Sequence, residues 1–190
     1  ALQITGAAWL SRRPEGIAAL PEARSVAVGL LTVSAGVALA VGAATLMHQR
    51  RPERRVGTLA SLQGALALAV IIASGPGPLP VAWFERWAAH LALALTGAAL
   101  LSRFLPVSSG EHARGGVLFR RHPAAGFAGL IACFSLAGLP GTPGAWLWLE
   151  AARSLAATRH VWLLMLLGVA WAVAFSSVMR QWREAAAIPE

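Results

Sequence analysis

The sequence has no lysine, no aspartate and a single cysteine, and charged residues occupy only 13% of its 190 positions. A soluble domain is usually about a quarter charged, so this scarcity of charge argues against a soluble globular domain. The cysteine, Cys133, has no second cysteine with which to form an internal disulfide, and together with His112 and His122 it shows no metal-ligand spacing. There is no dinucleotide fingerprint, phosphate-binding loop or Ser/His/Asp arrangement. We therefore expect no soluble catalytic site, and no metal or cofactor bound by this chain.

Apolar residues are abundant, because they make up 57% of the chain and give it a mean hydropathy of +0.62. The net charge is +8, and all 16 cationic residues are arginine. Such a basic chain could bind nucleic acid. The arginines, however, lie between apolar runs, which is where membrane proteins carry them. The composition therefore predicts an integral membrane protein that contacts the lipid bilayer and no nucleic acid.

The apolar runs are long enough to cross about 30 Å of hydrocarbon, which takes roughly 20 helical residues. The sequence predicts an all-α, polytopic transmembrane bundle of about five spans over residues 26–180. Residues 1–25 are expected to be a loop or the end of a helix whose start is missing, and residues 181–190 a polar tail. The expected spans are residues 26–47, 56–74, 81–104, 124–157 and 161–179.

The arginines are distributed unequally between the two ends of this bundle. With five spans, six arginines fall on one side and ten on the other, and the richer side is expected to be cytoplasmic. This places the basic loop that contains Arg50, Arg51, Arg54 and Arg55, and the C-terminus, in the cytoplasm. That loop could bind anionic lipid head groups, or it could serve only as a determinant of topology. The ten arginines are Arg50, Arg51, Arg54, Arg55, Arg103, Arg114, Arg120, Arg121, Arg180 and Arg183.

The fourth span is interrupted by two prolines and two glycines within five residues. Neither half is long enough to cross the membrane alone, so the two halves together predict one discontinuous helix, broken at 140–144. Irregular backbone at membrane depth persists only where protein or a water-filled cavity satisfies it, and transporters use such breaks as ion sites. The alternative is a proline kink between two ordinary helices. The residues of the interruption are Pro140, Gly141, Thr142, Pro143 and Gly144.

Two ionisable residues inside apolar runs are candidates for a proton path. Glu150 follows the interruption by about two turns, and a carboxylate within an apolar stretch is a proton-site candidate. Its alternative role is an interfacial ion pair with Arg153, three residues later. His90 lies in the third span, and imidazole titrates near neutral pH. The alternative for His90 is a packed side chain bonded to the carbonyl of a neighbouring helix.

The stretch around the interruption resembles a known family. Residues 134–146 read Phe-Ser-Leu-Ala-Gly-Leu-Pro-Gly-Thr-Pro-Gly-Ala-Trp. This is similar to the broken helix of the antiporter-like, proton-translocating membrane subunits of respiratory complex I, membrane-bound hydrogenases and Mrp antiporters. Other segments follow the family's order, and the resemblance covers about residues 26–183. These segments are Gln49-Arg-Arg-Pro-Glu-Arg-Arg, Thr58-Leu-Ala-Ser-Leu, Trp87-Ala-Ala-His-Leu and Arg121-His-Pro.

The resemblance implies the C-terminal half of such a subunit, or a degenerate member, which contains the second of the family's two inverted repeats. It implies other membrane subunits of a multisubunit complex as partners, and a bacterial cytoplasmic membrane as the location. It also implies proton movement coupled to an NADH:quinone oxidoreductase or a related hydrogenase. Quinone or NADH would then be bound only through the parent complex.

Three positions depart from the family's pattern. The family has a titratable residue eight positions after the motif proline, and here that position is Trp148. The lysine before the second span is replaced by Arg54, which holds its proton too tightly to transfer it. The lysine that often follows the family's histidine is replaced by Ala94. Two hypotheses therefore remain open, a subunit that conducts protons through His90 and Glu150, and a structural subunit that conducts none. A membrane-embedded enzyme ranks third, because no motif supports it.

Overall fold

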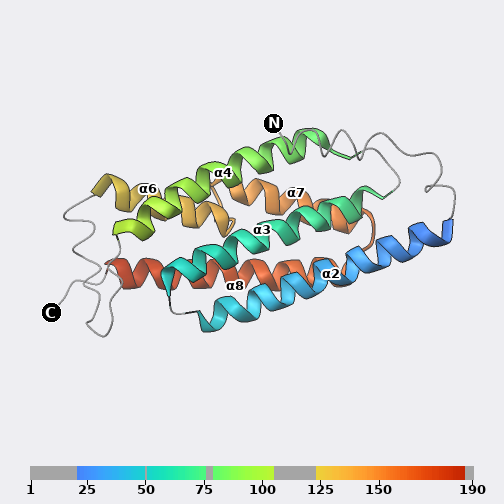
Figure 1. Ribbon diagram of the computed structural model, residues 1–190, viewed down its shortest axis with the longest axis horizontal. Helices are drawn as coiled ribbons and strands as arrows, with labels where there is room; N and C mark the ends of the chain where they lie inside the picture. The colour runs from blue at the N-terminus through green and yellow to red at the C-terminus, as the bar shows by residue number, and fades with distance from the viewer. Residues whose placement is uncertain (1–20, 50, 76–78, 105–122, 187–190) are drawn as a thin grey trace.

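The computed structural model describes residues 21–49, 51–75, 79–104 and 123–186. Within these ranges the chain is all helical and contains no strand. The helices lie roughly along one direction and form an elongated bundle (Figure 1). They are α2 (Pro21–His48), α3 (Pro52–Ser74), α4 (Val81–Phe104), α6 (Pro123–Leu136), α7 (Pro143–Ala157) and α8 (Val161–Ala186).

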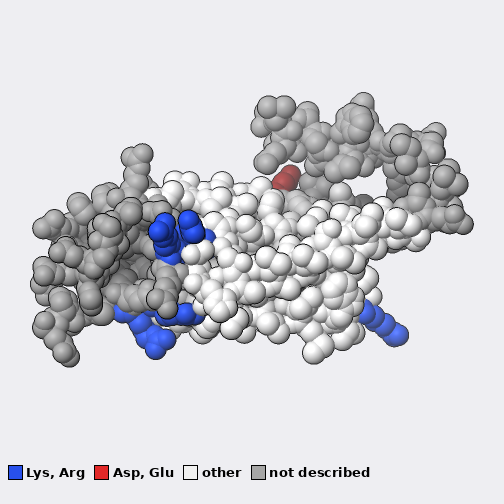
Figure 2. Space-filling model, turned by 60° about the horizontal axis from the view of Figure 1, so that its bottom comes forward, with Lys and Arg blue, Asp and Glu red and all other residues white. Residues whose placement is uncertain are grey.

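Three helices are long and apolar enough to cross a membrane on their own. They contain the stretches Ser25–His48, Arg54–Ser74 and Val161–Arg183, which belong to α2, α3 and α8. On the face drawn in Figure 2, arginines gather at the end where α2 joins α3 and α8 ends, and most of the surface between the two ends of the bundle is uncharged. A mostly uncharged surface with arginines toward the ends is typical of a protein that lies in a bilayer. The prediction of an all-helical membrane protein is confirmed, and the number of spans stays a prediction.

Several helix boundaries differ from those predicted. α2 begins at Pro21 and α3 at Pro52, so residues 21–25 and Arg55 are helical and do not lie in loops. Proline is favoured in the first turn of a helix because its missing N–H would have no partner there. α8 continues to Ala186, beyond the predicted end at residue 179. The helix continues beyond the predicted apolar span, so the expected polar tail begins as helix.

The interruption of the fourth span begins and ends earlier than residues 140–144. α6 ends at Leu136 because Gly138, with φ of 71°, turns the chain into the left-handed region. Its N–H donates to the Ser135 carbonyl at 3.0 Å, and the Leu139 N–H donates to the Phe134 carbonyl at 2.9 Å. These two bonds form a Schellman motif. α7 then starts with Thr142 as N-cap and Pro143 in its first turn, so the last two residues of the predicted break are helical.

α3 occupies the centre of the bundle and packs against α2, α4, α6, α7 and α8. Its buried leucines Leu59, Leu62 and Leu66 form the middle of the apolar core. Gly42 lets α2 come close, since a Cβ at this position would lie 2.6 Å from the Leu62 side chain. In lipid, small residues at contacts favour association because they let helix backbones pack closely. α4 and α6 form another extensive contact, and this contact places His90 beside the interruption.

Candidate functional site

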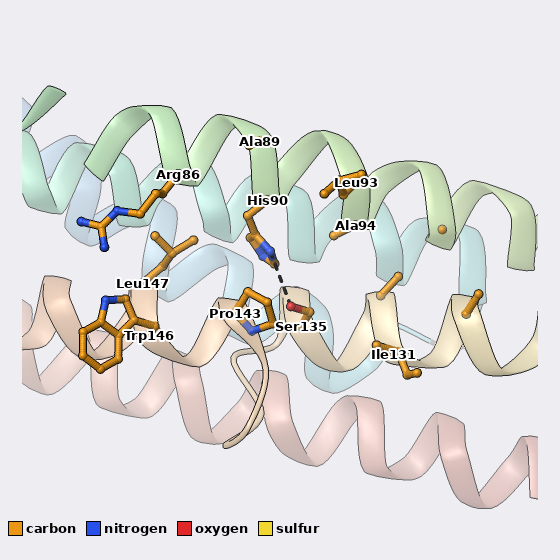
Figure 3. Close-up of a pocket in the computed structure, with 13 residues that line it drawn as sticks. Arg86, Ala89, His90, Leu93, Ala94, Ile131, Ser135, Pro143, Trp146 and Leu147 are labelled. Atoms are coloured by element: carbon orange, nitrogen blue, oxygen red, sulfur yellow. Dashed lines mark hydrogen bonds between the residues drawn. The ribbon is translucent and has the colours of Figure 1, made fainter. Parts of the chain in front are cut away.

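His90 on α4 meets both halves of the interrupted segment. Its Nδ1 lies 3.5 Å from the Oγ of Ser135, which is in the last turn of α6. The same Oγ accepts a hydrogen bond of 3.2 Å from the backbone N–H of Gly144, the second residue of α7. Figure 3 shows His90 reaching from α4 toward Ser135 and Pro143. One histidine and one hydroxyl therefore link three helices at the point where the backbone is interrupted.

The two nitrogens of His90 have different surroundings. Nδ1 faces the Ser135 hydroxyl, which can donate to it or accept from it, and which also accepts from the Gly144 N–H. Nε2 is buried and has no hydrogen-bond partner among the described residues. The histidine thus has one nitrogen engaged with the interruption and one that is buried without a partner among the described residues.

The carbonyl groups released by the interruption are bonded by side chains, two of which come from other helices. Gln63 on α3 donates its Nε2–H to the Leu136 carbonyl at 2.7 Å, and Trp171 on α8 donates its Nε1–H to the Gly138 carbonyl at 2.9 Å. Thr142 donates to the Leu139 carbonyl at 2.7 Å. A buried backbone group without a partner costs free energy comparable to a lost hydrogen bond, so these bonds allow the chain to remain irregular there.

We expect Trp171→Phe to destabilise the protein by about 1–3 kcal/mol, because the Gly138 carbonyl would lose its donor while most of the ring packing stays. Thermal unfolding in detergent, followed by circular dichroism, measures this loss. Trp162→Phe is the matched control, since it removes an indole N–H from a ring that is 46% exposed. Equal melting temperatures for both variants would contradict the importance of the Gly138 bond.

The Glu150 side chain forms an ion pair with a residue of α4 and not with one of its own helix, α7. Its Oε1 lies 3.4 Å from Nη2 of Arg86, and the side chains of Glu150 and Arg86 are 25% and 53% exposed. The guanidinium of Arg153, the expected partner in the alternative interpretation, instead lies 6.0 Å from the ring centre of Trp146. The pair ties α4 to α7, although at this exposure it contributes little to stability.

Trp148 occupies the position where the resembled family has a titratable residue, and it is completely buried. Its ring stacks on Trp171, with the ring centroids 6.0 Å apart. Its Nε1 has no hydrogen-bond partner among the described residues. An indole neither gains nor loses a proton near neutral pH. The position is therefore a packed part of the core in this chain.

The predicted basic loop is divided by the structure. Arg51 and Arg54 are exposed, and Arg50 lies outside the described residues. Arg55 is in α3 and only 2% exposed, and its Nη2 donates to the Gln49 carbonyl at 3.0 Å. Arg55 thus holds the turn between α2 and α3.

Gln63, Ser135 and Trp171 are site residues that the sequence did not identify. The one feature of the sequence that could have pointed to these residues is that each has a polar group within an apolar run.

A groove of about 710 Å³ lies between α4, α6 and α7 on the side where His90 and Ser135 meet. Its walls are mostly apolar, and Arg86 lies at one end of it (Figure 3).

The chain matches none of the family models searched, and no curated protein matches it. The fold and the composition define the class of the protein, an all-helical protein embedded in a membrane.

Proposed function

We propose that this chain is an antiporter-like membrane subunit of a redox-linked complex and that it moves protons through His90. The observation that carries the proposal is the contact of His90 with Ser135 and, through it, with the N–H of Gly144 across the interruption. A group that titrates near neutral pH and lies at membrane depth is a functional site by default.

The two nitrogens of His90 are differently placed, and this asymmetry suits a proton relay. Nδ1 is engaged by Ser135, whereas Nε2 is buried without a partner among the described residues. A change in the protonation of His90 would alter its contact with Ser135, whose Oγ also accepts from the start of α7. A proton on His90 would in this way be coupled to the geometry of the interruption. Glu150 follows along the same α4–α7 contact and serves as the second group.

A scaffold that conducts no protons is the alternative function, and two observations favour it. Trp148 is completely buried at the position of the family's titratable residue. Glu150 is engaged by Arg86, so its carboxylate already has a charged partner on α4. In this alternative the chain would pack against other membrane subunits and the polar groups would only satisfy the interruption.

Both functions require partner subunits, and purification tests this requirement. Exposed apolar side chains such as Leu93, Phe127 and Ile131 lie on α4 and α6. We expect the chain, extracted in a mild detergent, to elute with other membrane proteins that mass spectrometry identifies as subunits of an oxidoreductase. NADH or quinone would bind to those partners. A stable and monodisperse monomer would contradict the proposal of a multisubunit complex.

The proposed topology has the α2–α3 turn and the C-terminus in the cytoplasm. A cysteine introduced as Pro52→Cys in a Cys133→Ala background should therefore resist an impermeant maleimide added to intact cells. It should react once the cells are permeabilised. Thr158→Cys, at the exposed turn between α7 and α8, is the matched control and should react from outside. The opposite pattern of labelling would reverse the orientation.

A further inference from the structure

Three apolar stretches that are long enough to cross a membrane have a basic residue at the same end of the bundle. His48 is the last residue of the stretch in α2, Arg54 is the first residue of the stretch in α3, and Arg183 is the last residue of the stretch in α8 (Figure 1). These stretches have 24, 21 and 23 residues, which is about 32–36 Å at about 1.5 Å per residue. Because the hydrocarbon core is roughly 30 Å thick, the ends of such helices reach the level of the lipid head groups.

This end of the bundle carries an excess of positive charge. Residues 49–55 and 180–186 contain six arginines and two glutamates. The opposite end is nearly balanced, since residues 21–24, 81–86 and 150–159 contain four arginines and three glutamates. Figure 2 shows arginines gathered at the first of these ends. Four arginines here form no ion pair among the described residues, and together they are named the basic end. They are Arg51, Arg54, Arg180 and Arg183.

The arginines of the basic end come from two helices that meet at the turn between α2 and α3. Nη1 of Arg180 lies 3.5 Å from the Met47 carbonyl, so the last part of α8 lies against the end of α2. Arg183 is exposed about one turn further along α8, and Arg51 and Arg54 are exposed at the start of α3. A guanidinium group binds phosphate through two parallel N–H donors. The basic end therefore offers several exposed donors for phosphate groups.

Exposed apolar side chains share the faces of α2 and α8 that end in these basic residues. Val41 is 58% exposed, and His48 follows about two turns later on the same face of α2. Met165 and Val169 are 69% and 57% exposed, and Arg183 follows about five and about four turns later on the same face of α8. A soluble anion can contact only the charges. A ligand with a phosphate and long acyl chains can contact the charges and the apolar faces together.

We propose that the basic end binds anionic phospholipids of the surrounding bilayer. Their phosphates contact the arginines of the basic end, and their acyl chains lie along the exposed faces of α2 and α8. Net charge selects the class of lipid, because the ammonium of a zwitterionic head group opposes the arginines whereas an anionic head group does not. Each arginine near an anionic membrane surface strengthens binding about fivefold. The surface includes neither His90 nor Glu150, so the inference is separate from proton movement.

Native mass spectrometry of the purified protein, with whatever subunits it retains, tests the proposal. The delipidated protein is titrated with dioleoyl-phosphatidylglycerol, with dioleoyl-phosphatidylcholine, and with glycerol 3-phosphate, which has the phosphate but no acyl chain. We expect phosphatidylglycerol to bind about 25-fold more tightly than phosphatidylcholine, as expected for a head group that contacts two arginines. Equal binding of the two phospholipids would overturn the proposal and leave the arginines as determinants of topology. Binding of glycerol 3-phosphate as tight as that of phosphatidylglycerol would also overturn it.

Variants locate the preference on the protein. Combining Arg54→Gln with Arg183→Gln should weaken phosphatidylglycerol binding to the level of phosphatidylcholine, and lysine at both positions should keep the preference because the charge stays. Arg153→Gln combined with Arg159→Gln is the matched control, since it removes two exposed arginines from the opposite end. This control should bind both phospholipids as the unmodified protein does. An unchanged preference in the first pair of substitutions, or equal losses in the two glutamine pairs, would show that the basic end does not select the lipid.

Discussion

Replacing His90 with alanine is expected to reduce proton pumping by the parent complex by about a hundredfold, with assembly retained. The expectation follows from general acid–base chemistry, in which a positioned group that gains and loses a proton accelerates transfer by about 10²–10⁴-fold. His90 is the one buried histidine of the described residues, and it alone contacts the interruption at Ser135. Pumping is measured as acidification of inverted vesicles, normalised to electron transfer through the same vesicles.

His90→Gln separates a relay from a structural role. Glutamine can still hydrogen bond with Ser135, but it does not titrate. If His90 conducts, both variants should pump poorly and assemble normally. If His90 only holds the interruption together, glutamine should restore most of the pumping that alanine removes. His48→Ala is the matched control, because His48 is exposed at the end of α2.

Glu150→Gln decides whether the carboxylate belongs to the same path. It keeps the length of the side chain and removes the charge that pairs with Arg86. Loss of pumping in this variant supports a path through both residues. Normal pumping by the His90 variants and by Glu150→Gln together would exclude conduction through this chain, and the scaffold function would then be the remaining proposal.

Gly144→Ala is expected to cause the largest loss of stability from the addition of a single methyl group. A Cβ at this position would overlap the backbone carbonyl oxygen of Ser135 and would lie 3.2 Å from Nε2 of His90. The obstructing atom is part of the backbone, so relief requires the end of α6 to move away from the start of α7. Overpacking of this kind costs about 1–3 kcal/mol and sometimes more. It would also break the bond from Gly144 N–H to Ser135.

Thermal unfolding in detergent measures the effect, and we expect the melting temperature to fall by several degrees, at about 2–4 °C per kcal/mol. Gly168→Ala is the matched control. Gly168 is exposed in α8, and nothing lies within 4 Å of a Cβ placed there. Alanine at that site should be neutral or should stabilise the helix by about 1 kcal/mol. Equal stability of the two variants would contradict the close approach of α6 and α7.

The elements of the bundle were largely predictable because hydropathy is a local property. The run that begins at Val81 and ends at Phe104 was predicted with both boundaries as the structure has them. The interruption was predicted from its prolines and glycines, but three residues too late. Its start depends on Gly138 adopting a left-handed conformation, and the sequence alone offers several glycines that could do so. The position of a helix end is decided by backbone hydrogen bonds, which composition does not specify.

The partners of the polar residues could not be predicted in the same way. Gln63 and Leu136 are 73 positions apart, and Ser135 and His90 are 45 apart. Their contacts depend on how each helix is rotated about its axis and on which helices are neighbours. Glu150 illustrates this point, because sequence distance favoured Arg153 and the fold instead brings Arg86 to it.

By itself, then, the sequence determined that the protein is helical, that it belongs in a membrane, and that its fourth apolar run is interrupted. These properties follow from transfer free energies and backbone preferences, which sum along the chain. Only the tertiary structure decided that His90 meets both halves of the interruption and that Trp171 and Gln63 satisfy its carbonyls. It also decided that an apolar groove opens beside them. Such contacts arise from packing between distant segments, and the free energy of packing belongs to pairs of surfaces and not to any one stretch of residues.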